Sequence, residues 1–145
     1  MSLDRAWIVA HIPHQGGMCL LDAVDSWNEA GIVCRANSHR LLDNPLRTGD
    51  SLGIANGIEY AAQAMAVHGA LLASDENVPA SGFLTSMRDV QWNCIRLDDI
   101  ESDLTIRAER ISSNGNNVLY SFAVNATGTT VMSGRASVMI NAEGK

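Results

Sequence analysis

Cysteine is scarce in this chain. Only three occur in 145 residues, Cys19, Cys34 and Cys94, and no two of them form a C-x-x-C pair. An odd number of widely spaced cysteines argues against a disulfide framework and against a zinc ribbon. We therefore expect a protein of a reducing compartment, the cytoplasm.

Lysine is almost missing. Nine of the ten cationic residues are Arg, the only Lys is Lys145, and the formal net charge is −6. Binding to nucleic acid requires a cationic surface that displaces counterions, and this sequence has no basic run. Nucleic acid is therefore excluded as an expected partner.

Long apolar runs are also missing. A membrane span needs roughly 18 apolar residues, and the apolar stretches here are interrupted by Glu, Gln, His or Gly before that length. The run at residues 6–10 follows Asp4 and Arg5 and lacks the basic start and cleavage site of a secretory signal. We expect no membrane span, and we treat residues 1–145 as a single domain, because that length supports one core.

One segment reads as a long helix. Residues 57–73, GIEYAAQAMAVHGALLA, are rich in the good helix formers Ala, Leu and Met. Glu59 is the only side chain in it that is fully ionised at neutral pH. A helix that is apolar on nearly every side is a buried helix, and its many alanines allow a sheet to approach closely.

The second half of the chain reads as strands. Leu104, Ile106 and Ala108 alternate with more polar residues, as in a half-buried strand. Asn-Gly within residues 112–117 and Thr-Gly at 127–128 are turn signals between neighbouring antiparallel strands. The expected strands are 31–38, 83–92, 104–109, 118–125 and 129–140. With the helix they predict an α+β fold, in which a curved antiparallel sheet wraps one long helix.

Glu59 is the first candidate functional residue. It lies in the first turn of the expected helix, and a buried carboxylate must pair, bind donors or take up a proton. One interpretation is a general acid or base. The other is a first-turn Glu that the helix dipole stabilises while its carboxylate stays in water.

Two further polar residues lie on the same helix. Gln63 is one turn after Glu59, near the same face, where it could bind the Glu59 carboxyl group or a substrate carbonyl. The alternative is a core amide bonded to the backbone. His68 is nine positions after Glu59 and points to the opposite side, so we expect a core histidine with satisfied ring nitrogens.

The remaining histidines lie in or beside loops. His39 ends the strand 31–38 and opens a long loop over residues 40–56, and loops on a rigid scaffold commonly carry catalytic groups. The alternative is an exposed loop histidine. His11 and His14 flank Ile12-Pro13, but no third ligand matches them, so we expect no metal.

The order of these motifs resembles a known family. IPHQGGMCLLDAV, then His39 in SHR, then GIEYAAQA at the start of a long helix resemble the hot-dog-fold 3-hydroxyacyl-(acyl carrier protein) dehydratases. Within that family the chain is most similar to the divergent branch associated with aryl polyene biosynthesis. The resemblance covers about the whole chain.

The resemblance implies an activity and a site. The activity is dehydration of 3-hydroxyacyl thioesters on acyl carrier protein to trans-2-enoyl thioesters, without cofactor or metal. His39 is the implied base and Glu59 the implied acid, although His39 lacks the G-H-F-P-G surroundings usual in the family. His14 is then the next candidate for the base.

The implied substrate contacts and partners follow. Backbone N–H groups near Gly57 and Ile58 would stabilise the enolate-like oxygen, with Gln63 and His14 as further substrate contacts. The implied partners are an acyl group bound to carrier protein or to CoA, and a second chain in a homodimer or heterodimer. Two alternatives stay open: a hot-dog thioesterase in which Glu59 activates water, and a non-catalytic acyl-binding or partner subunit.

Overall fold

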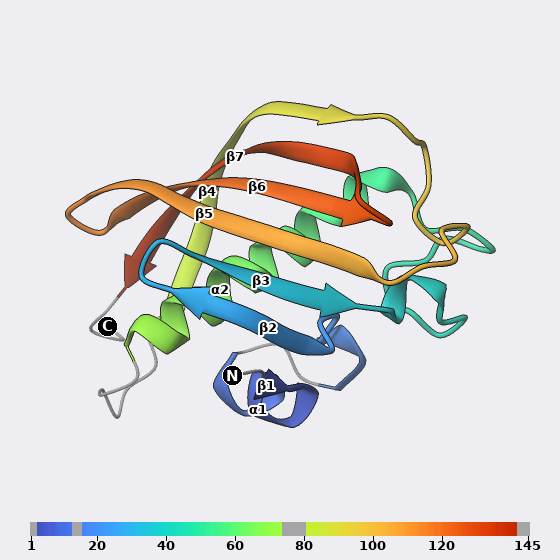
Figure 1. Cartoon of the computed structure of the whole chain (residues 1–145), viewed down its shortest axis with the longest axis horizontal. Helices are drawn as coiled ribbons and strands as arrows, with labels where there is room; N and C mark the ends of the chain where they lie inside the picture. The colour runs from blue at the N-terminus through green and yellow to red at the C-terminus, as the bar shows by residue number, and fades with distance from the viewer. Residues whose placement is uncertain (1–2, 13–15, 74–80, 142–145) are drawn as a thin grey trace.

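The computed structural model describes residues 3–12, 16–73 and 81–141. In this part of the chain a single curved antiparallel sheet has the strand order β1-β2-β3-β5-β6-β7-β4 (Figure 1). Its strands are β1 (Leu3–Asp4), β2 (Ala23–Asn28), β3 (Gly31–Ala36), β4 (Ser81–Trp92), β5 (Leu104–Asn114), β6 (Asn117–Ala126) and β7 (Thr129–Asn141). The predicted α+β architecture is thereby confirmed.

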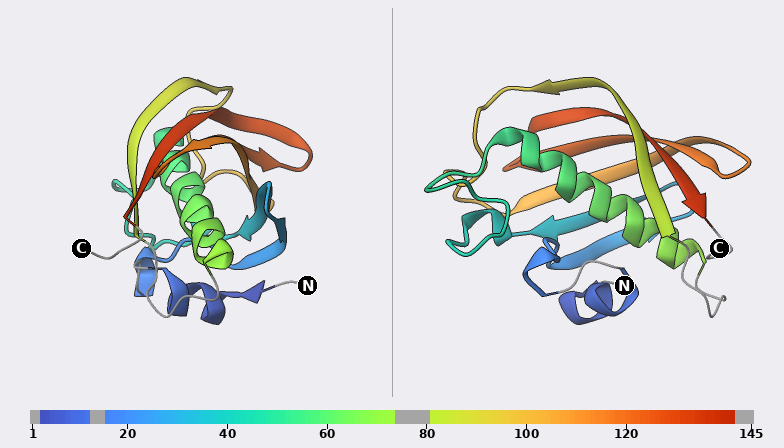
Figure 2. Two further views of the ribbon diagram at one scale, coloured as in Figure 1. Left: turned by 90° about the vertical axis from the view of Figure 1, so that its left-hand side faces the viewer. Right: turned by 180° about the vertical axis from the view of Figure 1, so that it is seen from behind.

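The long helix is α2, Gly57–Leu72, and it matches the predicted helix at 57–73 to within one residue. It crosses the concave face of the sheet, as the view from behind shows (Figure 2), and packs against β3, β5 and β6. The chain enters α2 from the β3 side and then runs to β4, the far edge of the sheet. The helix thereby fills the inside of the curved sheet.

The core follows the alternation in the sequence. On β6, Val118, Tyr120, Phe122 and Val124 face the helix and are buried, whereas the residues between them are half-buried. Leu104, Ile106 and Ala108 do the same on β5. A strand side-chain period of two therefore places one apolar face of each strand on α2.

Both predicted turns are present, but the first is shorter than residues 112–117. Asn114 pairs with Asn117, so the turn consists of Gly115 and Asn116 alone, with Gly115 at φ 64°. A two-residue turn with a positive φ at its first central residue is a hairpin turn that glycine favours. In the second turn Thr127 and Gly128 both have positive φ, at 48° and 81°.

The beginning of the chain contains elements that the sequence pattern did not predict. A second helix, α1, spans Arg5–His11. Asp4 caps its N-terminus, because the Asp4 carboxylate accepts a hydrogen bond from the Trp7 N–H at 3.1 Å. Strand β2 was missed as well, because its outer four residues are exposed and carry no apolar alternation. The one long central helix is as predicted, and α1 is a short helix outside it. None of the described helices is long and apolar enough to cross a membrane.

Candidate functional site

Glu59 occupies the first turn of α2, and its side chain is exposed. Among the described residues no hydrogen bond or ion pair reaches its carboxylate. The expectation that the helix would bury Glu59 is wrong for the single chain. The reason is geometric, because the sheet covers only part of the circumference of α2.

The uncovered side of α2 is a narrow strip that begins at Glu59. Its other members are small residues at helical spacing that are only half-buried: Ala62, Ala66, Gly69 and Ala70. The opposite side of α2 is buried against the sheet. Glu59 therefore stands at the start of the one open side of the helix.

Gly57 begins α2 in close contact with β7. A Cβ atom at this position would lie 3.0 Å from the Met132 Sδ, so a larger residue would push the helix start off the sheet. The Gly57 N–H already donates to the carbonyls of Ile54 and Ala55 in the preceding 3₁₀ turn. A substrate oxygen would have to compete with these bonds for the Gly57 N–H. Both Gly57 and Ile58 stay predictions as oxyanion donors.

Gln63 has both ends of its amide bonded to backbone. Its Oε1 accepts from the Leu20 N–H at 2.8 Å, and its Nε2 donates to the Met18 carbonyl at 2.6 Å. The side chain is buried and makes no bond to Glu59 in the described part of the chain. The geometry is that of the core amide kept as an alternative, and it fixes residues 18–20 to the helix.

His39 lies in the 3₁₀ turn Ser38–Arg40 directly after β3, and its ring is fully buried. The alternative of an exposed loop histidine is therefore wrong. The ring Nε2 lies 3.0 Å from the Ile100 carbonyl. A carbonyl only accepts, so Nε2 carries the proton and Nδ1 has the free lone pair.

The Nδ1 atom of His39 is buried and has no hydrogen-bond partner. Burial lowers the pKa of the His39 imidazole, and the Arg40 charge lowers it further, against the opposing effect of the Ile100 carbonyl. The ring is thereby held neutral, with an unbonded basic nitrogen. An unsatisfied buried acceptor is unusual and calls for a functional or structural reason.

Tyr60, which the sequence analysis did not single out, connects α2 to the His39 turn. The Asn44 amide donates to the Tyr60 hydroxyl at 3.2 Å, the Tyr60 hydroxyl lies 2.8 Å from Ser38 Oγ, and Ser38 Oγ donates to the Leu20 carbonyl at 2.7 Å. Because Ser38 uses its proton on Leu20, Tyr60 must donate to Ser38. Burial raises the pKa of Tyr60, which keeps this donor protonated.

The candidate residues are therefore only partly brought together. Ser38 and Tyr60, the sequence neighbours of His39 and Glu59, are hydrogen-bonded, but among the described residues no bond joins His39 to Glu59 themselves. His14 lies outside the described residues. His68 is the satisfied core histidine expected, with Nδ1 2.7 Å from the Tyr120 hydroxyl and Nε2 2.7 Å from the Asn28 carbonyl.

Exposed apolar side chains lie on the loops that flank the helix start. The Ile54 N–H donates to the Ile95 carbonyl, which places the loop after β4 against the segment that enters α2. Four large side chains of these loops and of the end of β4 are at least half exposed: Leu41 at 50%, Leu42 at 89%, Trp92 at 58% and Ile95 at 80%. This end of the molecule therefore combines an unpaired carboxylate with an uncovered apolar surface.

The described hollow of the surface lies away from the candidate residues. No three His, Cys, Asp or Glu side chains of the described ranges gather as metal ligands. A hollow of about 400 Å³ lies on the outer face of the sheet, over β2, β3, β5 and β6, and no candidate residue lines it. The chemistry-bearing residues and this hollow are on different faces.

The comparisons with solved structures establish the fold. The dehydratase heterocomplex ApeI:P from Xenorhabdus doucetiae matches with a TM-score of 0.81 at 20% identity, over 91% of this chain and 89% of that one. A mutant of the thioesterase PA1618 from Pseudomonas aeruginosa matches with a TM-score of 0.65 at 10% identity, over 95% of this chain and 94% of that one. The predicted hot-dog fold is confirmed.

The comparison with family models is more specific. No protein of curated function matches the sequence. A family model described as ApeP-like, ApeP dehydratase, matches residues 7–144. That range contains both motif segments on which the resemblance rests, including Glu59 and its helix, and the chain belongs to the ApeP-like dehydratase family.

Proposed function

We propose that this chain takes part in dehydrating a 3-hydroxyacyl thioester, carried on acyl carrier protein or CoA, to a trans-2-enoyl thioester. The observation that carries the proposal is Glu59, an exposed and unpaired carboxylate at the start of an otherwise apolar helix in a family of dehydratases. An exposed carboxylate is ordinary on a protein surface. The support for Glu59 is instead its place, as the one acidic side chain of α2 and next to exposed apolar side chains, where a substrate or partner surface would bind.

In the proposed reaction a base removes the proton from C2 of the acyl chain and an acid protonates the C3 hydroxyl. The hydroxyl leaves as water, and a C2–C3 double bond forms. Glu59 is the proposed acid, and a partner surface and the substrate would exclude water from it. A backbone N–H at the helix start, at Gly57 or Ile58, would bind the thioester oxygen.

His39 is the proposed base because it is a neutral imidazole with an unbonded Nδ1. A general base must have its lone pair free and its pKa near or below the working pH. In the single chain the ring is sealed from solvent. Access therefore requires that the loop 40–56 or the segment around Ile100 move when substrate or a partner binds.

A partner chain is the second part of the proposal. ApeI:P is a heterocomplex, and this chain presents both the edge strand β4 and the exposed Trp92 and Ile95 beside it. Unpaired sheet edges are normally covered or paired. We propose a dimer with a second copy or with a related chain, which covers Glu59 and completes the site.

The burial of His39 also favours a second candidate function. A histidine with no exposed atom and one nitrogen fixed on a backbone carbonyl suits a structural role. The chain would then be the non-catalytic partner of another dehydratase subunit. In that case its Glu59 strip would complete the site of the catalytic chain or hold the acyl group.

One experiment separates these functions. The purified chain, alone and then with a related dehydratase chain, is offered 3-hydroxyacyl thioesters on carrier protein and on CoA, and the acyl mass is followed. Loss of one water by the chain alone supports the dehydratase. If water is lost only with the partner, the variant His39→Ala of this chain separates the two functions. Lost activity supports a catalytic chain in a heterodimer, and retained activity supports the non-catalytic partner. Release of the free hydroxy acid indicates a thioesterase instead.

A further inference from the structure

The loop that joins β4 to β5, residues 93–103, contacts the segment that leads into α2. Its Leu97 N–H donates to the Leu52 carbonyl at 2.7 Å, and its Ile95 carbonyl accepts from the Ile54 N–H at 3.0 Å. Between these bonds, Gly53 and Arg96 form an antiparallel bridge. Gly53 is thereby held in an isolated β-bridge, directly before the 3₁₀ turn Ile54–Asn56 that leads into the helix that carries Glu59.

The Asp98 side chain points from this loop toward the segment that leads into α2. Its Oδ1 accepts from the Leu52 N–H at 2.8 Å and from Arg96 Nε at 3.0 Å, and its Oδ2 accepts from Arg96 Nη2 at 2.5 Å. Its side chain is only 6% exposed. The two-pronged geometry is the strong, directional form of an Arg–carboxylate pair.

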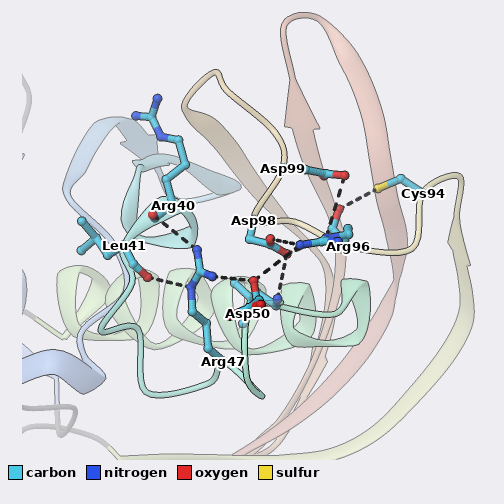
Figure 3. A network of polar contacts seen from close by, with 9 residues as sticks. Arg40, Leu41, Arg47, Asp50, Cys94, Arg96, Asp98 and Asp99 are labelled. Carbon is cyan, nitrogen blue, oxygen red and sulfur yellow. Dashed lines mark hydrogen bonds and ion pairs between the residues drawn. The ribbon is translucent and has the colours of Figure 1, made fainter.

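A second set of bonds ties the loop 40–51 to the same place. Arg47 donates to the Asp50 carbonyl at 2.8 Å, and Arg96 reaches that same carbonyl at 3.5 Å. Arg47 also donates to the Leu41 carbonyl at 2.8 Å. Figure 3 shows the two guanidinium groups converging on Asp50 from opposite sides.

The 93–103 loop also holds the His39 turn at its other end. The Ile100 N–H donates to the Leu97 carbonyl at 3.0 Å, and the Ile100 carbonyl binds His39 Nε2. The residue after His39, Arg40, donates to the Glu101 carbonyl and to the Asp103 carboxylate. A single loop therefore fixes both the helix lead-in and the histidine ring.

We infer that Asp98, clamped by Arg96, is the positioning residue of the candidate site, because it fixes the chain entering α2 and thereby sets where Glu59 stands. Glu59 follows Leu52 by seven residues, through a 3₁₀ turn and one helical turn. Among the described residues, Asp98 is the only acceptor of a hydrogen bond from the Leu52 N–H. This inference rests on the proposed function for its catalytic consequence only.

The electrostatics support a permanent clamp. The Arg96 hydrogen bonds hold the pKa of Asp98 well below its usual range, more than its burial raises it. The carboxylate is therefore charged throughout the pH range in which a dehydratase works. A displacement of about 1 Å in a reacting group can cost roughly 10²-fold in rate, so loosening the lead-in should reach the chemistry.

The test compares Asp98→Ala and Arg96→Met with the control Asp25→Ala. Asp98→Ala removes both the Leu52 bond and the Arg96 pair, whereas Arg96→Met keeps the Leu52 bond and removes only the guanidinium. Asp25→Ala breaks another two-pronged Arg–Asp pair, with Arg35 on β3, which is more exposed than the Asp98 pair and lies away from the 93–103 loop. Thermal melting of each variant establishes that it is folded.

Two readouts are taken on the full chain, with its partner when one is required for activity. The first is amide hydrogen exchange at Leu52 and the α2 start, and the second is kcat and KM for dehydration. Asp98→Ala should exchange the Leu52 amide at least about tenfold faster and lose at least about tenfold in kcat, with KM within about twofold. For Arg96→Met, the exchange rate and kcat should both lie between those of Asp98→Ala and the parent. For Asp25→Ala, both should match the parent.

An unchanged Leu52 exchange rate in folded Asp98→Ala would overturn the inference, and so would faster exchange with the parent kcat. If Asp98→Ala does not fold, Arg96→Met decides in the same way: parent-like exchange and kcat would overturn the inference. A parent that dehydrates nothing, alone or with a partner, refutes the proposed function, and the exchange readout then still decides whether Asp98 holds the start of α2.

Discussion

At the scale of single residues, the two proposed proton-transfer groups differ sharply in environment. Glu59 stands in the open at the start of α2, whereas His39 is sealed under the 93–103 loop with one bonded and one unbonded ring nitrogen. The helix pattern allows Glu59 to be found from sequence, since it is the one acid in an apolar segment. The burial of His39 was not predictable, because its partner Ile100 lies 61 residues away.

The proposed role of His39 gives a kinetic prediction. Replacing His39 by Ala removes the base and should lower dehydration by at least about 10²-fold, the effect of a positioned proton-transfer group. The measurement is the initial rate on a 3-hydroxyacyl thioester, with thermal melting to establish folding. His11→Ala is the matched control, because His11 is exposed and lies outside the site. Activity of His39→Ala within twofold of the parent would move the base elsewhere, first to His14.

The two buried histidines also predict a pH dependence of stability. Burial lowers the pKa of both His39 and His68 in the folded chain. The unfolded chain binds these protons near pH 6.5, before the folded chain does, so their contribution is complete above about pH 6.5 and is lost as pH falls toward the folded-state values.

The free energy of unfolding by urea should therefore fall between about pH 7 and pH 5.5. The variant His68→Gln should show a shallower decline over this interval than the parent. A parent whose stability is flat or rises on acidification across the interval would contradict the assignment of both rings as neutral core groups.

At the scale of elements, the sequence predicts α2 from its run of apolar helix formers, and the hairpins of β5, β6 and β7 from alternating apolar residues and turn residues. The helix was one residue too long, and the 31–38 strand ends early at Ala36 because Ser38–Arg40 turns back toward Tyr60. β2 and α1 were missed, since a polar edge strand and a seven-residue helix have too little periodicity. Sequence periodicity thus predicts the elements that bury a face and misses those that only border the core.

Gln63, predicted as a substrate contact, joins α2 to the backbone of residues 18–20, and this gives a stability prediction. Its amide binds the backbone of Met18 and Leu20, so Gln63→Leu, which keeps the volume, leaves the buried Leu20 N–H and the partly buried Met18 carbonyl unpaired. The cost should be about 1–3 kcal/mol for each unpaired group, less whatever water recovers. Chemical denaturation measures it. A variant as stable as the parent but with a raised KM would instead show that Gln63 serves the substrate.

At the scale of the whole molecule, the single chain exposes what an assembly would cover. The edge strand β4, the open strip of α2 and the apolar side chains Trp92 and Ile95 are all uncovered. No periodicity in one sequence states which surface a second chain occupies, so the sequence predicts a dimer only through the family resemblance.

Assembly is therefore predicted in its own right. Light scattering at micromolar protein should give the mass of a dimer, either for the chain alone or after mixing with a related chain. Trp92→Ser and Ile95→Ser should weaken that dimer, whereas a matched change at Ile111→Ser, on the exposed end of β5, should not. A strictly monomeric mass with every related chain offered would refute the partner proposal.

The most direct test of the account is the dehydration rate of Glu59→Gln. Gln keeps the shape but cannot give a proton to the leaving hydroxyl, and because Glu59 is exposed, stability should change by no more than the about 0.3–1 kcal/mol of a helix-dipole contribution. The control is Glu29→Gln, an exposed acid in the β2–β3 turn. We expect Glu59→Gln to form a folded dimer that is nearly inactive on 3-hydroxyacyl thioester, while Glu29→Gln matches the parent. Normal turnover by folded Glu59→Gln would contradict it.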